Sequence, residues 1–149
     1  MLSLDRARVL GAQSDGLAVV VTTRPDGSAQ ASVVHAGVTV NPVTGEPVVA
    51  FVVRGPARKL TNLRARPRIS VVVRAGWEWL AVEGEAGLAG PDDVLEGLDE
   101  GDVAGLLRDI YAAAVGGTPD QWRQLDQAMA AERHTAVLVR PTRIYSNPT

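Results

Sequence analysis

The sequence contains no cysteine and only two histidines, His35 and His134, among its 149 residues. A chain without cysteine has no thiol nucleophile and no disulfide, and two histidines leave no plausible zinc site, so we expect no metal. Apolar runs are short, since none reaches the roughly 18 residues of a membrane-spanning helix. The N-terminus lacks the order of basic and then apolar residues that marks a secretory signal. These absences favour a cytoplasmic protein that binds no membrane.

The motifs of several common enzyme classes are also missing. There is no Gly-x-Ser-x-Gly elbow for acyl transfer, and no GxGxxG begins a helix as in a Rossmann site. Glu83 and Glu85 share one face of a predicted strand, but Gly84 between them fits a packed strand end as well as a glycosidase pair. One Phe, two Tyr and a formal net charge of -2 give little for nucleic acid to stack on or pair with. We therefore expect no nucleic-acid partner.

What is present is typical of one globular domain spanning residues 1–149. Hydrophobic residues make up 46% and charged residues 21%, and a chain of this length buries enough surface for one domain with a core but is too short for two domains. Amphipathic spacing predicts helices at 3–14, at 103–115 and, after a capping box that starts at Thr118, to about residue 132. Runs of β-branched residues between turn residues predict strands at 17–23, 29–40, 47–53, 68–75, 77–89 and 135–140.

The last predicted strand ends at Pro141, with an extension through Ile144 and Tyr145 left open. Short turns join most of the strands, so the expected fold is α+β: a six-stranded, mostly antiparallel β-barrel with flanking helices. An acidic segment at 92–102 holds six acidic residues and no basic one. We interpret it as a solvated, partly helical insert.

A basic segment from Arg54 to Arg68 holds six basic residues and no acidic one. Pro56, the spacing of Leu60 and Leu63, and Pro67 predict a helix of about ten residues that ends before Pro67. Three of its side chains, those of Arg58, Lys59 and Asn62, would stand near one another close to the positive end of the helix. Such a set can hold an anion, although a basic run is more often a solvated face.

Trp77 and Trp79 are two of only three tryptophans in the chain. Period-two geometry places both on one face of the strand predicted at 77–89, where a flat conjugated ring could lie against them. The alternative is that the two indoles belong to the core or to an interface.

These segments together resemble a known family. The pattern consists of ArgLysLeuThrAsnLeuArg at 58–64, then Pro67-Arg68, a β-branched run, Gly76-Trp77-x-Trp79 and Val82-Glu83-Gly84. It resembles the split-barrel flavin and deazaflavin reductases related to pyridoxamine 5′-phosphate oxidase. The similarity is greatest to the actinobacterial group that uses the deazaflavin coenzyme F(420), the FDOR-B type. It extends from about Gly16 to Asn147.

The resemblance implies a homodimer whose coenzyme lies in a groove between two identical barrels. Two long strands that expose apolar residues independently favour a dimer, since a monomer would leave a large apolar patch. Carried over by position, the resemblance assigns cofactor-binding roles to eight residues. The acidic tail would be held by Arg58, Lys59 and Asn62, with Arg133 as a further contact; the ring would lie along Ser32 and Val34, and Trp77 and Trp79 would come from the other subunit.

The function implied by the resemblance is hydride transfer from reduced F(420) to a conjugated small-molecule acceptor such as a quinone, an enone or a biliverdin-like tetrapyrrole. Because the coenzyme carries the hydride, no residue is assigned as catalytic. His35 is a candidate proton donor, although a lone histidine on a strand more often satisfies a local hydrogen bond. Two alternatives stay open: an FMN-dependent oxidase or reductase of the same fold, and a non-enzymatic protein that binds a flavin, a deazaflavin or a tetrapyrrole.

Overall fold

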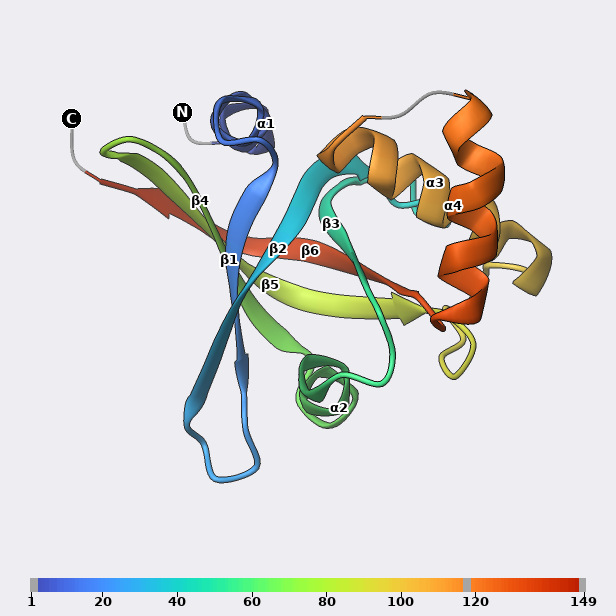
Figure 1. Ribbon diagram of the computed structural model, residues 1–149. Coiled ribbons are helices and arrows are strands. Elements are labelled where there is room, and N and C mark those ends of the chain that lie inside the picture. Colours follow the sequence, from blue (N-terminus) through green and yellow to red (C-terminus); the bar gives the residue numbers. More distant parts are fainter. Residues whose placement is uncertain (1–2, 117–118, 148–149) are drawn as a thin grey trace.

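The computed structural model describes residues 3–116 and 119–147, and it confirms an α+β fold built on a six-stranded barrel (Figure 1). Every strand pairs antiparallel with its neighbours, and the closed barrel has the order β1-β2-β3-β6-β5-β4. The strands are β1 (Leu17–Thr23), β2 (Ala29–Val40), β3 (Pro47–Val53), β4 (Arg68–Ala75), β5 (Glu78–Ala89) and β6 (Thr135–Ser146).

Two hydrophobic cores hold the molecule together. The first fills the barrel, where Phe51 of β3 is fully buried and the inward-facing valines of the other strands surround it. The helix α1 (Leu4–Gln13) extends this core, because Leu4, Ala7 and Leu10 recur at helical spacing and are all buried. The second core lies outside the barrel, between β3, β5 and β6 on one side and the helices α3 (Val103–Ala114) and α4 (Pro119–Ala131) on the other.

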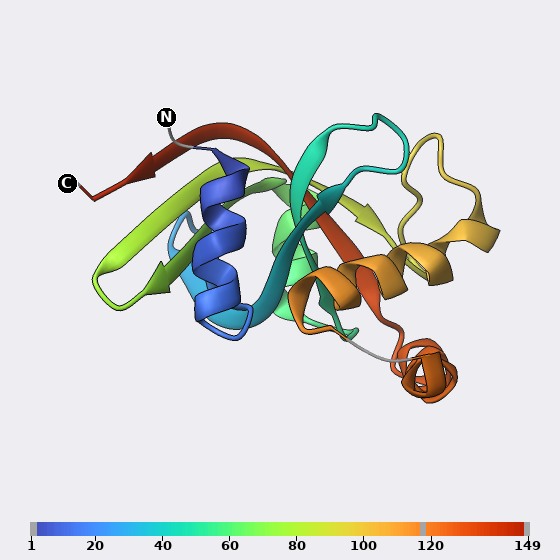
Figure 2. The same ribbon diagram turned by 90° about the horizontal axis from the view of Figure 1, so that it is seen from above.

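The helices cover different parts of the barrel. In Figure 1, α1 lies above the barrel and α2 (Arg58–Ala65) below it, while α3 and α4 stand together at the right. Figure 2, seen from above, shows α1 and α3 on either side of β2, with α4 viewed almost end-on. The predicted N-cap of α4, Thr118, lies outside the described residues. Among the described residues, no helix combines the length and the apolar character needed to cross a membrane.

Glycine lets α3 approach the barrel closely. A Cβ atom added to Gly37 of β2 would lie 2.5 Å from the carbonyl carbon of Ala113, and one added to Gly16 would meet the Ala114 carbonyl as closely. Only a residue without a side chain fits where two backbones come this near. The last turn of α3 is therefore packed directly onto the backbone at the start of β1 and the middle of β2.

The sixth strand is longer than predicted, because Pro141 does not end it. β6 continues to Ser146, and the pairing with β5 shifts register between Glu83 and Gly84, so that Gly84 faces Pro141 and Glu83 faces Arg143. A bulge tolerates proline since one residue there is left out of the ladder. Gly84 is needed at this point because a Cβ atom would lie 2.1 Å from the Arg140 carbonyl oxygen.

The acidic segment is mostly exposed and partly helical, as predicted, and two of its acids also attach it to the rest of the molecule. It contains one short 3₁₀ turn, η1 (Glu100–Asp102), and its first two acids form ion pairs with basic residues distant in sequence. Arg64 of α2 donates to both carboxylate oxygens of Asp93, at 2.9 and 2.7 Å, and Arg133 donates to Asp92 at 2.5 Å. The loop after β5 is thereby attached to α2 and to the turn before β6.

Candidate functional site

A cavity opens where β2 separates from β3. The two strands pair only from Ala36 to Val40 of β2, whereas Val52 and Val53 at the end of β3 pair with β6. The earlier part of β2 pairs with β1 alone, which leaves one side of it free of any strand. The C-terminal half of α3, with α4, covers this gap and leaves a cavity of about 600 Å³.

The cavity has apolar walls and a basic rim. Its apolar side chains include Val33 and Val34 of β2, Val52 and Val53 of β3, Ile110 and Tyr111 of α3, and Leu125 and Met129 of α4. Its polar side chains are those of His35, Arg54, Lys59, Tyr111 and His134, and the described part of the chain contributes no Asp or Glu to the lining. An apolar body with an acidic group is the kind of molecule that such a cavity suits.

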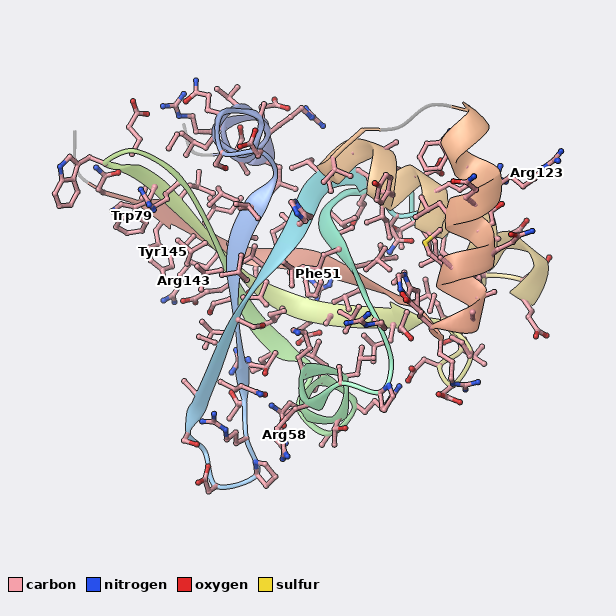
Figure 3. All side chains as sticks on the ribbon, viewed as in Figure 1. Phe51, Arg58, Trp79, Arg123, Arg143 and Tyr145 are labelled. Carbon is pink, nitrogen blue, oxygen red and sulfur yellow. The ribbon has the colours of Figure 1, made fainter. Side chains whose placement is uncertain are left out.

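Lys59 and Arg58, although adjacent, point to different places. Lys59 is half-buried and lines the cavity, and within the described part of the chain its ammonium group makes no ion pair. Arg58 is exposed at the start of α2, below the barrel in Figure 3. Neighbouring residues are about 100° apart around a helix, so the two charges lie on either side of one helix end. Both are near the positive end of the α2 dipole.

Asn62, the third residue of the predicted anion set, points into the protein. Its side chain is only 1% exposed, and Nδ2 donates to Thr22 Oγ1 of β1 at 3.1 Å and to Gln30 Oε1 of β2 at 2.8 Å. These bonds fix α2 beneath the β1–β2 hairpin and so help to orient Arg58 and Lys59. Both donors of the amide nitrogen are thus occupied by the protein's own side chains.

On β2, the predicted ring contacts Ser32 and Val34 face the same way as Ala36, since alternate residues share a face. Val34 lines the cavity and also packs against the barrel core. Ser32 is half-buried opposite Val20 of β1. The cavity therefore includes Val34 and Lys59 from the predicted set.

Arg133 lies near the cavity but is occupied by the acidic segment. It follows α4, has a positive φ of 54°, and donates to Asp92. That hydrogen bond lowers the pKa of Asp92, because it favours the charged form of the carboxylate. An anion bound at Arg133 would compete with Asp92.

The two tryptophans lie at the other end of the molecule. Trp77 belongs to the turn between β4 and β5 and is 92% exposed, whereas Trp79 is half-buried and meets Tyr145 edge-on at 6.0 Å. Both line one shallow groove with Val72 and Arg74. Figure 3 shows Trp79 and Arg58 far apart, so one chain does not bring these predicted residues together.

Three polar residues of the rim form a small cluster that the sequence reasoning missed. Glu132 accepts a hydrogen bond from His134 Nε2 at 2.9 Å and lies 3.7 Å from an Arg54 guanidinium nitrogen. His134 Nδ1 is buried and makes no hydrogen bond with the described residues. His35 Nδ1 lies 3.2 Å from the Asp15 carbonyl oxygen, which directs that nitrogen away from the cavity.

The helical wall was likewise not assigned to a site. The amphipathic spacing of 103–115 predicted a helix, and Leu106, Leu107 and Ile110 of that helix are buried. Nothing in that spacing indicates which partner covers the helix, so the lining role of Ile110 and Tyr111 had no local signal. Among the described residues, no group of three or more His, Asp and Glu side chains is placed to hold a metal ion.

Comparison with solved structures identifies the fold. A conserved hypothetical protein from Mycobacterium tuberculosis superposes with a TM-score of 0.71 at 16% identity, covering 98% of this chain and 84% of its own. A pyridoxamine 5′-phosphate oxidase-related, FMN-binding protein from Nostoc punctiforme gives 0.67 at 13% identity, covering 96% and 80%. A protein described as an F(420) reductase gives 0.54 at 18% identity, covering 87% and 88%.

No protein-family model and no curated protein matches the sequence. At these identities, the structural likeness shows the fold alone. It confirms the split-barrel fold that the sequence led us to expect.

Proposed function

We propose that this protein is an oxidoreductase that transfers a hydride from reduced deazaflavin coenzyme F(420) to a conjugated small-molecule acceptor. The observation that carries the proposal is the cavity beside β2, which joins an apolar strand surface to the ammonium group of Lys59. A solved structure with the same fold is described as an F(420) reductase, and this adds support.

The residues present fit a coenzyme with a flat ring and an acidic tail. Val33 and Val34 offer an apolar surface on β2, with Ser32 farther along the strand. Lys59 and Arg58 at the positive end of α2 would hold the tail, and Arg133 would join them where the tail displaces Asp92. Asn62 acts here mainly by fixing α2. When bound, the coenzyme supplies the hydride, and one proton completes reduction of the acceptor.

The protein's own contribution is binding, orientation and exclusion of water. Ile110 and Met129 are almost fully buried and close the cavity on the side of the helices. An apolar wall of this kind keeps water from the reacting atoms and strengthens electrostatic contacts inside the site. His35, at the edge of the cavity, is the candidate to hold or pass the proton, because its Nδ1 is oriented by the Asp15 carbonyl.

We further propose that two chains form a homodimer and that each completes the other's site. The outer face of the barrel exposes large apolar side chains, among them Val33 at 63% and Trp77 at 92%. Two shallow grooves on this face share Val72 and Arg74 and connect Leu17, Val19 and Val33 with the two tryptophans. A second copy would cover this surface, and a two-fold axis would carry Trp77 and Trp79 to the partner's coenzyme.

The direct test is titration of the cofactor-free protein with F(420) and, separately, with FMN, followed by quenching of tryptophan fluorescence. We expect tight binding of F(420) and weak binding of FMN. Lys59→Ala should weaken F(420) binding about tenfold or more, since a charged hydrogen bond contributes roughly 1.5–3 kcal/mol. Arg123→Ala is the matched control, because this exposed arginine on α4 points away from the cavity (Figure 3). An unchanged dissociation constant for Lys59→Ala would contradict the site assignment.

The alternative function is that of an FMN-dependent oxidase or reductase. It is favoured by the Nostoc protein, which has this fold and is described as FMN-binding. The same titration separates the two, since FMN ends in a single phosphate and F(420) continues into a longer acidic tail. Tight FMN binding with weak F(420) binding would favour the alternative. Tight coenzyme binding without reduction of any acceptor in a panel of quinones, enones and tetrapyrroles would indicate a non-enzymatic carrier.

A further inference from the structure

We propose that the acceptor carries a carboxylate and that Arg54 recognises it. This inference rests on the proposed function, since it concerns the part of the cavity that remains once a coenzyme lies along β2 and Lys59. The substrate class is a conjugated apolar acid, and Arg54 is the residue that determines specificity for it.

The remaining part of the cavity suits a flat apolar body. Its walls come from α3 and α4, where Ile110 and Met129 are almost fully buried and Leu125 and Tyr111 are half-buried. Tyr111 packs edge-on against Trp122 of α4, with 5.7 Å between ring centroids and 79° between ring planes. This contact holds the tyrosine ring in place as part of the wall. A rigid aromatic wall favours a conjugated ring system over a flexible chain.

The basic charge of the rim favours a ligand with an anionic group. Among the described residues, four basic side chains line the cavity and no acidic one does, and Glu132 beside Arg54 is the acidic neighbour at the rim, so positive charge outweighs negative charge around an anionic ligand. With Lys59 assigned to the coenzyme, Arg54 is the remaining permanently charged group, and it stands directly after β3 at the mouth of the cavity. A neutral acceptor would leave this charge without a role in recognition.

The Arg54 side chain is exposed enough to bind a ligand, and its contact with Glu132 gives it a preferred orientation. Its side chain is 71% exposed, and its contact with Glu132 is loose, at 3.7 Å. Glu132 also accepts a hydrogen bond from His134 at 2.9 Å, so its carboxylate is shared between the two basic residues. The guanidinium therefore keeps donors available, and its planar fork matches a carboxylate with two parallel hydrogen bonds.

The test compares a matched pair of acceptors, a naphthoquinone with a propionate side chain and its methyl ester. Reduction by reduced F(420) is measured as kcat/KM, and each acceptor's Kd is measured by calorimetry on the protein with and without F(420). We expect the acid to be preferred about tenfold in kcat/KM, the range for an exposed charged contact that is partly screened. Arg54→Gln should reduce the preference to about twofold or less, mainly by lowering kcat/KM for the acid.

Two further variants make the result specific. Arg54→Lys keeps the charge but loses the fork, so we expect an intermediate preference of about threefold. Arg123→Gln removes an equally exposed charge from α4 and should leave the preference at the wild-type value. A thermal melt of each variant checks that the fold is intact, and the ratio of acid to ester is insensitive to a general loss of active protein.

The outcomes separate this inference from the proposed function. If F(420) binds but the wild type treats acid and ester alike, or Arg54→Gln keeps the preference, the inference is overturned and the proposed function stands. If F(420) does not bind, the proposed function fails, and the Kd values on the coenzyme-free protein still decide the inference. Equal values for acid and ester would overturn it, and tighter binding of the acid that depends on Arg54 would support it.

Discussion

Asn62 shows how one buried amide can orient the neighbouring side chains of a candidate site. It lies on the short helix that carries Arg58 and Lys59, but its nitrogen donates to Thr22 and Gln30 on the neighbouring hairpin. Thr22 is itself buried, so this contact satisfies polar groups that water cannot reach. The position of the two charged residues thus depends on a hydrogen-bond network behind them.

We predict that Asn62→Ala lowers the free energy of unfolding by about 2 kcal/mol, because it leaves a buried hydroxyl without a partner and creates a small cavity. The measurement is urea denaturation at neutral pH. Thr61→Ala, one residue earlier on the exposed side of α2, is the control and should change stability by less than about 0.5 kcal/mol. Wild-type stability in Asn62→Ala, together with lost coenzyme binding, would instead show that the amide contacts the ligand.

At the scale of elements, strand positions were predictable from local sequence and the walls of the cavity were not. The first three strands begin and end where β-branched runs meet turn residues, as predicted. β6 was predicted too short because proline was read as a terminator, whereas the bulge opposite Gly84 accommodates it. A bulge depends on the partner strand, which no local pattern in 135–146 identifies.

Part of the candidate site was also predictable from the sequence, and part of it was not. Lys59 and Val34 line the cavity as placed by the resemblance, and their role toward a coenzyme stays a prediction. Arg54, Tyr111 and Met129 join them only because the chain folds α3 and α4 over the gap between β2 and β3. Contacts of this kind are set by packing between segments far apart in sequence, which residue periodicity does not encode.

The two helices over the cavity are joined by an ion pair between Arg108 of α3 and Asp126 of α4. Arg108 Nε lies 2.8 and 3.1 Å from the two carboxylate oxygens, and this hydrogen bonding lowers the pKa of Asp126 below its usual range. A lowered pKa in the folded state means that the pair stabilises the protein above the unfolded pKa of about 4 and loses this effect as pH falls through the folded pKa.

We therefore predict that Asp126→Asn lowers the free energy of unfolding by about 1 kcal/mol at pH 7, a value reduced by partial exposure of the pair. The difference between wild type and variant should shrink as pH falls below about 4 and vanish once Asp126 is protonated in the folded state. Chemical denaturation across this range measures it. Asp109→Asn, which removes an exposed carboxylate from the same helix as Arg108, controls for the loss of one negative charge, and a difference for Asp126→Asn that stays constant at all pH values would contradict the assignment.

At the scale of the whole molecule, Lys59 and Trp77 lie far apart in one chain. This separation allows a test of whether each coenzyme site takes residues from both chains of a dimer. We predict that Lys59→Ala and Trp77→Ala homodimers each bind coenzyme poorly, but that subunits mixed at random recover about a quarter of the wild-type binding sites. Half of the dimers are then mixed, and each mixed dimer has one site with both changes and one with neither. Co-expression of the two chains and titration with F(420) counts these sites.

The control for this experiment mixes Lys59→Ala with Arg58→Ala. Both changes lie on the same α2 helix, so every site in a mixed dimer carries one of them and no intact site forms. Recovery in the control, or none with Trp77→Ala, would show that the tryptophans do not act across a dimer. Sedimentation of the wild type establishes the number of chains independently.

The way α3 and α4 attach to the barrel has a consequence for how new specificities can arise. They form one continuous stretch of chain, and they meet the sheet through apolar packing and the close approach at Gly37, with no ladder hydrogen bonds. Replacing that stretch alone would exchange the acceptor-facing wall and leave the strands, α2 and Lys59 untouched. Under the proposed function, the strands and α2 would bind the coenzyme and this stretch would face the acceptor, so chimaeras in which only residues 103–131 are exchanged offer a route to new substrate ranges.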